Sequence, residues 1–146
     1  RSAGYVKHIS RPGTADQYCS RLSPHLTWGS LSVREVVKAT NSFLQSPQVS
    51  LHHSQRRSLS AFSSRLSWRC HFIQKLEDQP QIEFKCMHSA YETIRPLEGD
   101  LSAYTAWAEG NTGYPLVDAC MRSLIHRGWI TFRMRAMLVS FASYHL

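Results

Sequence analysis

The chain has 146 residues, of which 42% are hydrophobic and 18% charged, so it is long and apolar enough for one folded domain and is not a disordered chain. With a net charge of +7 and an isoelectric point of about 9.6, it either binds a polyanion, such as nucleic acid or a phosphate-bearing cofactor, or only carries a basic surface. The four cysteines form no CxxC pair and the eight histidines no HExxH motif, so we expect neither a metal site nor a disulfide framework.

The first third of the sequence predicts an irregular lead followed by two helices. Residues 1–19 contain Pro12 and Gly13 and are expected to be irregular. A short helical turn follows, with Ser23 as its N-cap, Pro24 at its first position and Gly29 at its end. A capping box of Ser32 and Glu35 then opens a helix whose apolar side comprises Val33, Val36, Val37 and Phe43 or Leu44.

The segment 54–78 has the clearest helical period. Its apolar positions are Leu59, Phe62, Leu66, Ile73 and Leu76. Arg65 and Arg69 are one turn apart, and Trp68 lies between them in sequence. This is either a solvated basic face or a face that binds nucleic acid and stacks a base on the tryptophan.

The remainder predicts loops and short helices over 79–106 and then two helices. Pro115 starts the first of these, Asp118 lies in its first turn and Gly128 ends it. The second runs from about Trp129 to the end, with Met134, Met137 or Leu138, and Phe141 as core positions. No segment alternates with period two, so the chain is predicted to be all-α, with about five helices.

The stretch Ser20-Arg21-Leu22-Ser23-Pro24 combines two hydroxyls, a guanidinium and a helix start. Because a helix start offers unpaired N–H groups and positive potential, this stretch can cradle a phosphate. The alternative is an ordinary capped turn.

Arg133 and Arg135 stand two residues apart in the last predicted helix. Two helical residues are about 200° apart, so the two guanidiniums must point to opposite sides. If the helix is mostly buried, each arginine needs an anion or a route to water. One could face a cofactor and the other a nucleic-acid backbone, or both could form structural ion pairs.

Three blocks of the sequence are long enough to compare with known families: "CSRLSPHLTWGSLSVRE", "SRLSWRCHF" and "WAEGNTGYPLVDACMRSLIHRGWITFRMRAMLVSF". In this order they resemble the C-terminal helical FAD-binding domain of the cryptochrome/DNA photolyase family. The resemblance covers almost the whole chain. It implies one partial FAD-binding domain over 1–146, truncated at both ends, with the N-terminal α/β antenna domain and the C-terminal flavin-ring loop absent.

The resemblance implies FAD as cofactor and assigns residues to it. The first block corresponds to the pyrophosphate site, formed by Cys19, Ser20, Arg21, Leu22 and Ser23. Tyr5 corresponds to an upstream tyrosine that touches FAD, and Phe62 to an aromatic residue near the flavin. Arg69 and Arg135 correspond to arginines on the flavin side.

The resemblance also implies a DNA side. Trp68 corresponds to a tryptophan that packs on a flipped-out lesion, and Arg133 to an arginine that faces DNA. Two positions depart from the family pattern: Arg65 replaces a glutamate that hydrogen-bonds the lesion, and Phe132 replaces an asparagine. Arg65 either donates to a phosphate or carbonyl edge, or pairs with an acid such as Glu77 or Asp78, or with one beyond the sequence.

The implied function of the parent protein is light-driven electron transfer from flavin to a flipped DNA lesion, as in a deoxyribodipyrimidine photo-lyase. Two alternatives are a cryptochrome-like blue-light photoreceptor without repair activity and a flavin-independent helical nucleic-acid-binding module. The chain by itself is expected to be inactive, so no catalytic residue is assigned. Its expected partner is damaged or single-stranded DNA, and we expect a monomer. No signal peptide or membrane-spanning run is present in the sequence, so the expected location is cytoplasmic or nuclear.

Overall fold

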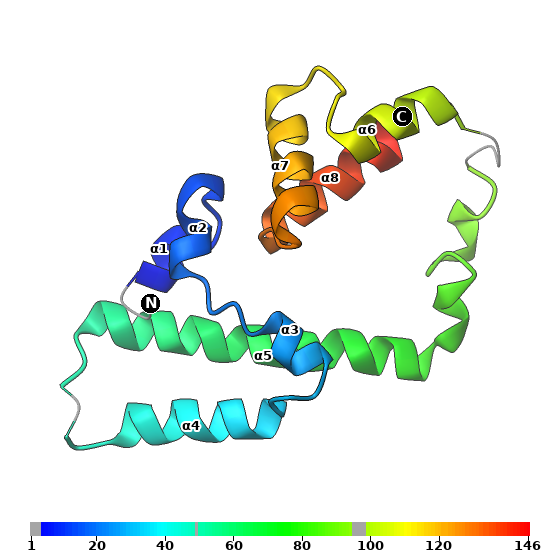
Figure 1. Cartoon of the computed structure of the whole chain (residues 1–146). Coiled ribbons are helices and arrows are strands. Elements are labelled where there is room, and N and C mark those ends of the chain that lie inside the picture. Colours follow the sequence, from blue (N-terminus) through cyan, green and yellow to red (C-terminus); the bar gives the residue numbers. More distant parts are fainter. Residues whose placement is uncertain (1–3, 49, 95–98) are drawn as a thin grey trace. The chain divides into compact units, whose positions relative to one another are not determined.

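The computed structural model describes residues 4–48, 50–94 and 99–146, and helices make up 72% of these described residues. No strand occurs among these described residues, which confirms the all-α prediction. The chain divides into two compact units (Figure 1). The first unit comprises Arg1–Ile9 and Gln17–Glu92, and the second comprises Ser10–Asp16 and Thr93–Leu146.

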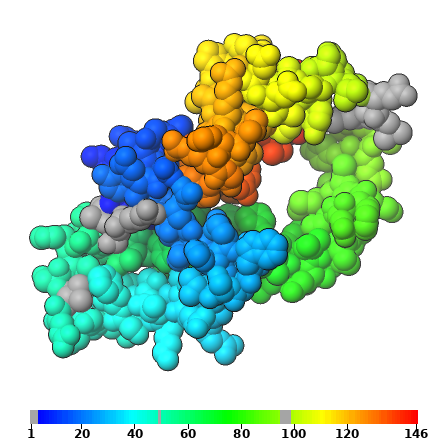
Figure 2. All heavy atoms as spheres, viewed as in Figure 1, coloured from blue at the N-terminus to red at the C-terminus, as the bar shows by residue number. Residues whose placement is uncertain are grey.

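The first unit is built around one long helix, α5 (His53–Asp78). Helix α4 (Val33–Gln45) packs alongside α5 (Figure 1). The same unit contains α1 (Tyr5–His8), α3 (Ser23–Thr27) and the 3₁₀ helices η2 (Pro80–Glu83) and η3 (Ser89–Tyr91). In Figure 2 the side chains of α4, in cyan, lie on the visible face of this unit.

The capping box that was predicted at the start of α4 is present. The Glu35 backbone N–H donates to Ser32 Oγ over 3.1 Å, and the Ser32 backbone N–H donates to Glu35 Oε2 over 2.8 Å. Two donors that the helix itself cannot satisfy are therefore satisfied locally.

The prediction of an irregular lead over residues 1–19 was wrong. The lead contains α1 and α2 (Pro12–Tyr18), and α2 spans the boundary between the two units. Pro12 occupies the first position of α2, where a proline costs no hydrogen bond. Helix α1 is only four residues long and depends on contacts far along the chain: the Val6 N–H donates to Ser58 Oγ over 3.5 Å.

The apolar period of α5 is buried in one half of the helix only. Leu66 is buried and Leu59 and Phe62 are half-buried, as their spacing predicts. Ile73 and Leu76 continue the same pattern but remain 41% and 48% exposed. The predicted helical spacing is therefore confirmed, but of these apolar side chains Leu66 is the one that is fully buried.

The second unit consists of α6 (Leu101–Glu109), α7 (Pro115–Arg127) and α8 (Phe132–His145), with residues 10–16 of the chain. Trp107 in α6 donates its Nε1–H to the Leu138 carbonyl over 3.2 Å, which fixes α6 to α8. The buried core of this unit is Val117, Cys120, Met121, Ile130, Met134 and Leu138.

One helix boundary in the second unit differs from prediction. Helix α7 begins at Pro115, and Gly128, with φ +63°, is its C-cap, both as predicted. Helix α8 begins at Phe132 and not near Trp129, because Thr131 is extended at the N-cap and accepts from the Met134 N–H over 3.3 Å. Helix α6, with 9 residues, begins in the region 79–106, for which loops and short helices were predicted.

Candidate functional site

The candidate cradle is the segment Ser20–Ser23, which joins α2 to α3 in the first unit. Arg21 has φ +59° and is the only non-glycine residue with positive φ among those that the structure describes. A left-handed conformation costs an L-residue about 1–2 kcal/mol. Such strain clusters at ligand clamps, so this turn is a marked feature of the cradle.

The cap of α3 differs from prediction. Leu22, not Ser23, is the N-cap, and it has helical angles (φ −86°, ψ −9°) with no side-chain capping bond. Ser23 is therefore the first helical residue, and its hydroxyl does not cap the helix. Pro24 then stands second in the helix, where it has no N–H to satisfy. The first turn still leaves the Ser23 N–H without a partner in the helix, as every helix start does.

Contacts on both sides of the cradle hold it in the first unit. Arg69 Nη2 donates to the Leu26 carbonyl over 3.4 Å, which links α5 to α3. On the other side, the Tyr18 ring stacks on His8 with centroids 4.0 Å apart. A side chain on Gly4 would collide with the Tyr18 ring, so this packing requires glycine. The cradle thus lies between two attachments that are distant in sequence.

Tyr5 connects α1 to α5 beside the cradle. It is 8% exposed, and its ring meets Phe62 edge-on with centroids 5.9 Å apart. Burial, and then the neighbouring Cys19 thiol, raise the pKa of Tyr5 to about 12, while the positive charge of Arg65 opposes the shift. At neutral pH Tyr5 is therefore a protonated phenol that can donate a hydrogen bond.

Arg65 and Trp68 lie on the exposed side of α5. The Trp68 side chain is 50% exposed, and its ring lies 5.9 Å from Phe72 and 6.0 Å from His71. The alternative in which Arg65 pairs with Glu77 or Asp78 does not hold. Because α5 is continuous, these acids lie 12 and 13 residues further on, about 18–20 Å along the axis.

Phe132, Arg133 and Arg135 lie in the first turn of α8, in the second unit. The argument that each arginine needs an anion or a route to water applied to a mostly buried helix. The start of α8 is not buried, because all three side chains are exposed and Phe132 is 71% exposed. Arg133 Nε donates to Ser10 Oγ over 2.7 Å. Neither arginine pairs with a carboxylate among the residues described, so structural ion pairs do not explain them.

Asp118 organises the loop before α7, a role that the sequence analysis missed. Its carboxylate accepts from the Thr112 N–H (2.8 Å), the Thr112 hydroxyl (2.6 Å) and the Gly113 N–H (2.9 Å). These bonds, the one from the Thr112 hydroxyl first, lower the pKa of Asp118. The sequence signal for this role is the short spacing from Thr112-Gly113 to Asp118, although an acid near a helix start is also explained by the helix dipole alone.

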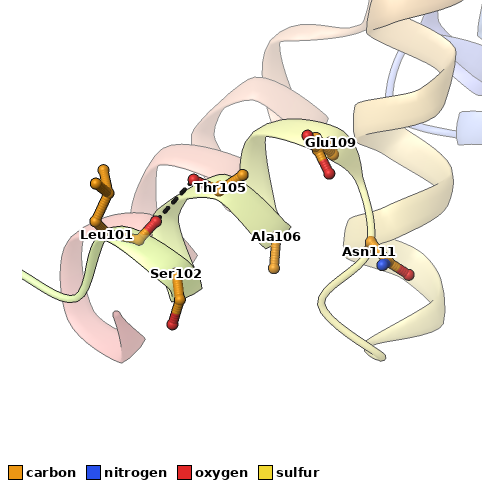
Figure 3. Close-up of a pocket in the computed structure, with 6 residues that line it drawn as sticks. All are labelled: Leu101, Ser102, Thr105, Ala106, Glu109 and Asn111. Carbon is orange, nitrogen blue, oxygen red and sulfur yellow. Dashed lines mark hydrogen bonds between the residues drawn. The ribbon is translucent and has the colours of Figure 1, made fainter.

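A shallow depression of about 580 Å³ lies on the side of α6 and the loop after it (Figure 3). Its lining contains none of the predicted site residues; it consists of Leu101, Ser102, Thr105, Ala106, Glu109 and Asn111. In the described ranges, no group of three His, Cys, Asp or Glu side chains could hold a metal. Within the same ranges, no helix is both long and apolar enough to cross a membrane.

Comparison with known proteins identifies the family. The family model "FAD binding domain of DNA photolyase" matches residues 62–146, more than half of the chain. The chain therefore belongs to this family, whose cofactor is FAD. The match begins at Phe62 and includes Arg65, Trp68, Arg69, Phe132, Arg133 and Arg135, whereas Tyr5 and the cradle precede it.

Individual relatives extend the similarity toward the N-terminus. The chain is 35% identical over 125 residues to a deoxyribodipyrimidine photo-lyase of Streptomyces griseus, covering 84% of this chain and 24% of that protein. It is 30% identical over 138 residues to one from Vibrio cholerae, covering 92% and 27%. It is also 33% identical over 127 residues to cryptochrome-2 of Arabidopsis thaliana, covering 84% and 20%. The chain thus spans about a quarter of the length of its curated relatives.

The donor set of the cradle suits the pyrophosphate of FAD. It offers the hydroxyls of Ser20 and Ser23, the Arg21 guanidinium and the N–H groups of a helix start, and it contains no carboxylate. These groups can donate hydrogen bonds to an anionic ligand that is rich in oxygen. None of them is negatively charged, so none repels the oxygens of that ligand.

Proposed function

We propose that this chain holds FAD for a light-driven flavoprotein of the photolyase/cryptochrome type. The observation that carries the proposal is the strained turn at Arg21, set in a segment of phosphate donors. In the proposal Cys19, Ser20, Arg21, Leu22 and Ser23 bind the pyrophosphate. Tyr5 and Phe62 pack nearby, and Arg69 and Arg135 act on the flavin side.

The chemistry is light-driven donation of an electron to a DNA lesion, and the flavin supplies that electron when it is bound. The residues of the chain bind and position. Trp68 stacks on the flipped base, and Arg65, Phe132 and Arg133 face the DNA. The photo-lyase names of several relatives support repair as the outcome.

The test of the cofactor site is FAD retention in the whole protein. Ser23→Ala and Ser20→Ala should each weaken FAD binding by about 0.5–1.5 kcal/mol, the net value of one hydrogen bond. Ser30→Ala is a matched control, because Ser30 is exposed and, among the residues described, its side chain bonds only to His25. Unchanged affinity in both cradle variants would show that the pyrophosphate binds elsewhere.

A second candidate is a blue-light photoreceptor that does not repair DNA. Two observations favour it: Arg65 stands where the resemblance implies a lesion-binding carboxylate, and cryptochrome-2 is among the relatives. Repair of an irradiated oligonucleotide under blue light separates the two candidates. A flavin absorption spectrum of the whole protein tests the remaining alternative, a flavin-independent nucleic-acid-binding module.

A further inference from the structure

The segment Ser10–Asp16 belongs to the second unit, although the residues on both sides of it in sequence belong to the first. At the end of the segment, Asp16 Oδ2 accepts from Arg127 Nη1 in α7 over 3.3 Å. At its start, Ser10 Oγ accepts from Arg133 Nε in α8 over 2.7 Å. The segment is thus bonded to both α7 and α8 within one unit.

The backbone next to Ser10 has little freedom. The Arg11 carbonyl accepts from the Thr14 and Ala15 N–H groups over 3.2 and 2.9 Å, so the first turn of α2 closes directly after Ser10. Pro12 has a fixed φ and also restricts Arg11 before it. The Ser10 hydroxyl is therefore held at a defined place against the Arg133 side chain.

The backbone of Arg133 is fixed as well, whereas its side chain is exposed. Thr131 caps α8 two residues before it, and the neighbouring side chains of Ile130 and Met134 are 3% and 8% exposed. An exposed arginine samples many rotamers, and ordering it for a contact costs free energy. The bond to Ser10 orders the side chain as far as Nε before any ligand binds.

This bond occupies the one nitrogen of Arg133 that an end-on phosphate contact does not use. A guanidinium has five N–H donors, and Nε carries one of them. The other four lie on Nη1 and Nη2, which together can bind two oxygens of one phosphate. Arg135, in the same turn, makes no such bond within the described ranges. Of these two arginines, Arg133 is therefore the one whose guanidinium is held ready for an anion.

A purely structural role for the bond is the alternative. The segment has other attachments, because Ala15 is 0% exposed and Asp16 pairs with Arg127. One hydrogen bond at an exposed position adds only modestly to these contacts. The effect on the Arg133 side chain is direct, and the two roles make different predictions for ligand binding.

We propose that Ser10 is a positioning residue, whose hydroxyl holds the Arg133 guanidinium so that Nη1 and Nη2 are presented to a DNA phosphate. The inference rests on the proposed function, in which Arg133 faces DNA, and adds a residue that acts only through this arginine. Ser10 lies outside the region 62–146 that the family model matches.

The test measures the affinity of the whole protein for a fluorescent DNA duplex that carries one pyrimidine dimer. Ser10→Ala should weaken binding about threefold to tenfold, as expected when one long side chain must be ordered on binding. The slope of log affinity against log salt should not change, because no charge is lost. Arg133→Ala should make this slope shallower by about 0.9, the value for one phosphate of a duplex. Adding Ser10→Ala to Arg133→Ala should cause no further loss, since the two residues act as one unit.

Two further variants control for the hydroxyl itself. Ser10→Thr keeps a hydroxyl at the same place and should restore native affinity. Ser140→Ala removes a hydroxyl from an exposed position of α8 that makes no hydrogen bond among the described residues, and it should change the affinity less than twofold. FAD retention in Ser10→Ala should equal that of the native protein. A parallel loss of FAD would show a structural defect and overturn the positioning role.

The outcomes separate this inference from the proposed function. Native affinity in Ser10→Ala, with a loss in Arg133→Ala, would overturn the positioning role and leave the proposed DNA side intact. Losses that multiply in the double variant would also overturn it, because Ser10 would then act without Arg133. Native affinity and an unchanged salt slope in Arg133→Ala would overturn the proposed DNA side, and the positioning role with it.

Discussion

The strained turn at Arg21 predicts that glycine stabilises the chain relative to alanine there, whereas inside a helix, at Lys38, glycine should destabilise it. At Arg21, with φ +59°, alanine retains a left-handed penalty of about 1–2 kcal/mol that glycine avoids. Glycine loses about 0.5–1 kcal/mol more backbone entropy on folding. The difference leaves Arg21→Gly more stable than Arg21→Ala by about 0.5–1 kcal/mol. Both variants lack the guanidinium, so only the backbone distinguishes them.

Thermal and urea unfolding, followed by helical circular dichroism, measure this difference. For a chain of this size it corresponds to a melting temperature higher by roughly 2–4 °C for the glycine variant. Lys38 lies inside α4 and provides the control, because there glycine should be about 1 kcal/mol less stable than alanine. If glycine is the less stable substituent at both positions, the left-handed turn at Arg21 is not present in solution. FAD retention should fall in both Arg21 variants.

Three further predictions concern packing and ionisation. Leu138→Ala should lower the free energy of unfolding by about 2–5 kcal/mol because Leu138 is 2% exposed. Val139→Ala, at a 55% exposed position, should change it by less than about 0.5 kcal/mol. Similar values for the two variants in urea titrations would contradict the assigned core. The lowered pKa of Asp118 means that its contribution to stability is complete above its ordinary pKa of about 3.9 and is lost as the pH falls through the lowered value. Melting temperatures against pH should therefore differ in shape between the native chain and Asp118→Asn, and parallel curves would exclude this role. The raised pKa of Tyr5 gives stability that is complete below about 10 and is lost as the pH rises to about 12; ultraviolet titration should show one late-ionising tyrosine that is absent in Tyr5→Phe.

The helix ends that local chemistry determines could be predicted from the sequence. Ser32 with Glu35, Pro115 and Gly128 each act within one turn of their own position, and the structure confirms all three. Helix α1 could not be predicted, because four residues form a stable helix only when something else holds them. Here that support comes from Ser58 and Phe62, more than fifty residues away in sequence.

The residues of the candidate site were proposed from the sequence, whereas their geometry could not be predicted from it. The resemblance gave the cradle, but an arginine in the left-handed region is uncommon and no propensity indicates it. The contact of Arg69 with the Leu26 carbonyl spans 43 residues and is equally invisible to a local pattern. The sequence also did not show whether α8 is mostly buried. The apolar residues of α8 occur on several sides of the helix, and Met134 and Leu138 are its buried residues, so Arg133 and Arg135 remain exposed.

If the proposed DNA side is correct, Arg65 should affect which strands the whole protein prefers. Its guanidinium can donate but cannot accept, so it suits phosphate or carbonyl oxygens and not the N–H edge of a pyrimidine dimer. Its positive charge also opposes the rise in the pKa of Tyr5, which burial raises to about 12.

In the whole protein, Arg65→Glu should weaken binding to undamaged single strands, because one positive charge is replaced by a negative one. It should raise the preference for a dimer-containing strand by about tenfold, the lower end for a hydrogen bond to a charged group. Arg65→Gln is the control, because it removes the charge and supplies only a neutral acceptor, and it should give a smaller preference. Binding to matched damaged and undamaged oligonucleotides, followed by repair under blue light, measures both effects. If the native protein already repairs dimers efficiently and Arg65→Glu changes neither the preference nor the rate, then Arg65 does not face the lesion, and the departure from the family pattern has no consequence for the substrate.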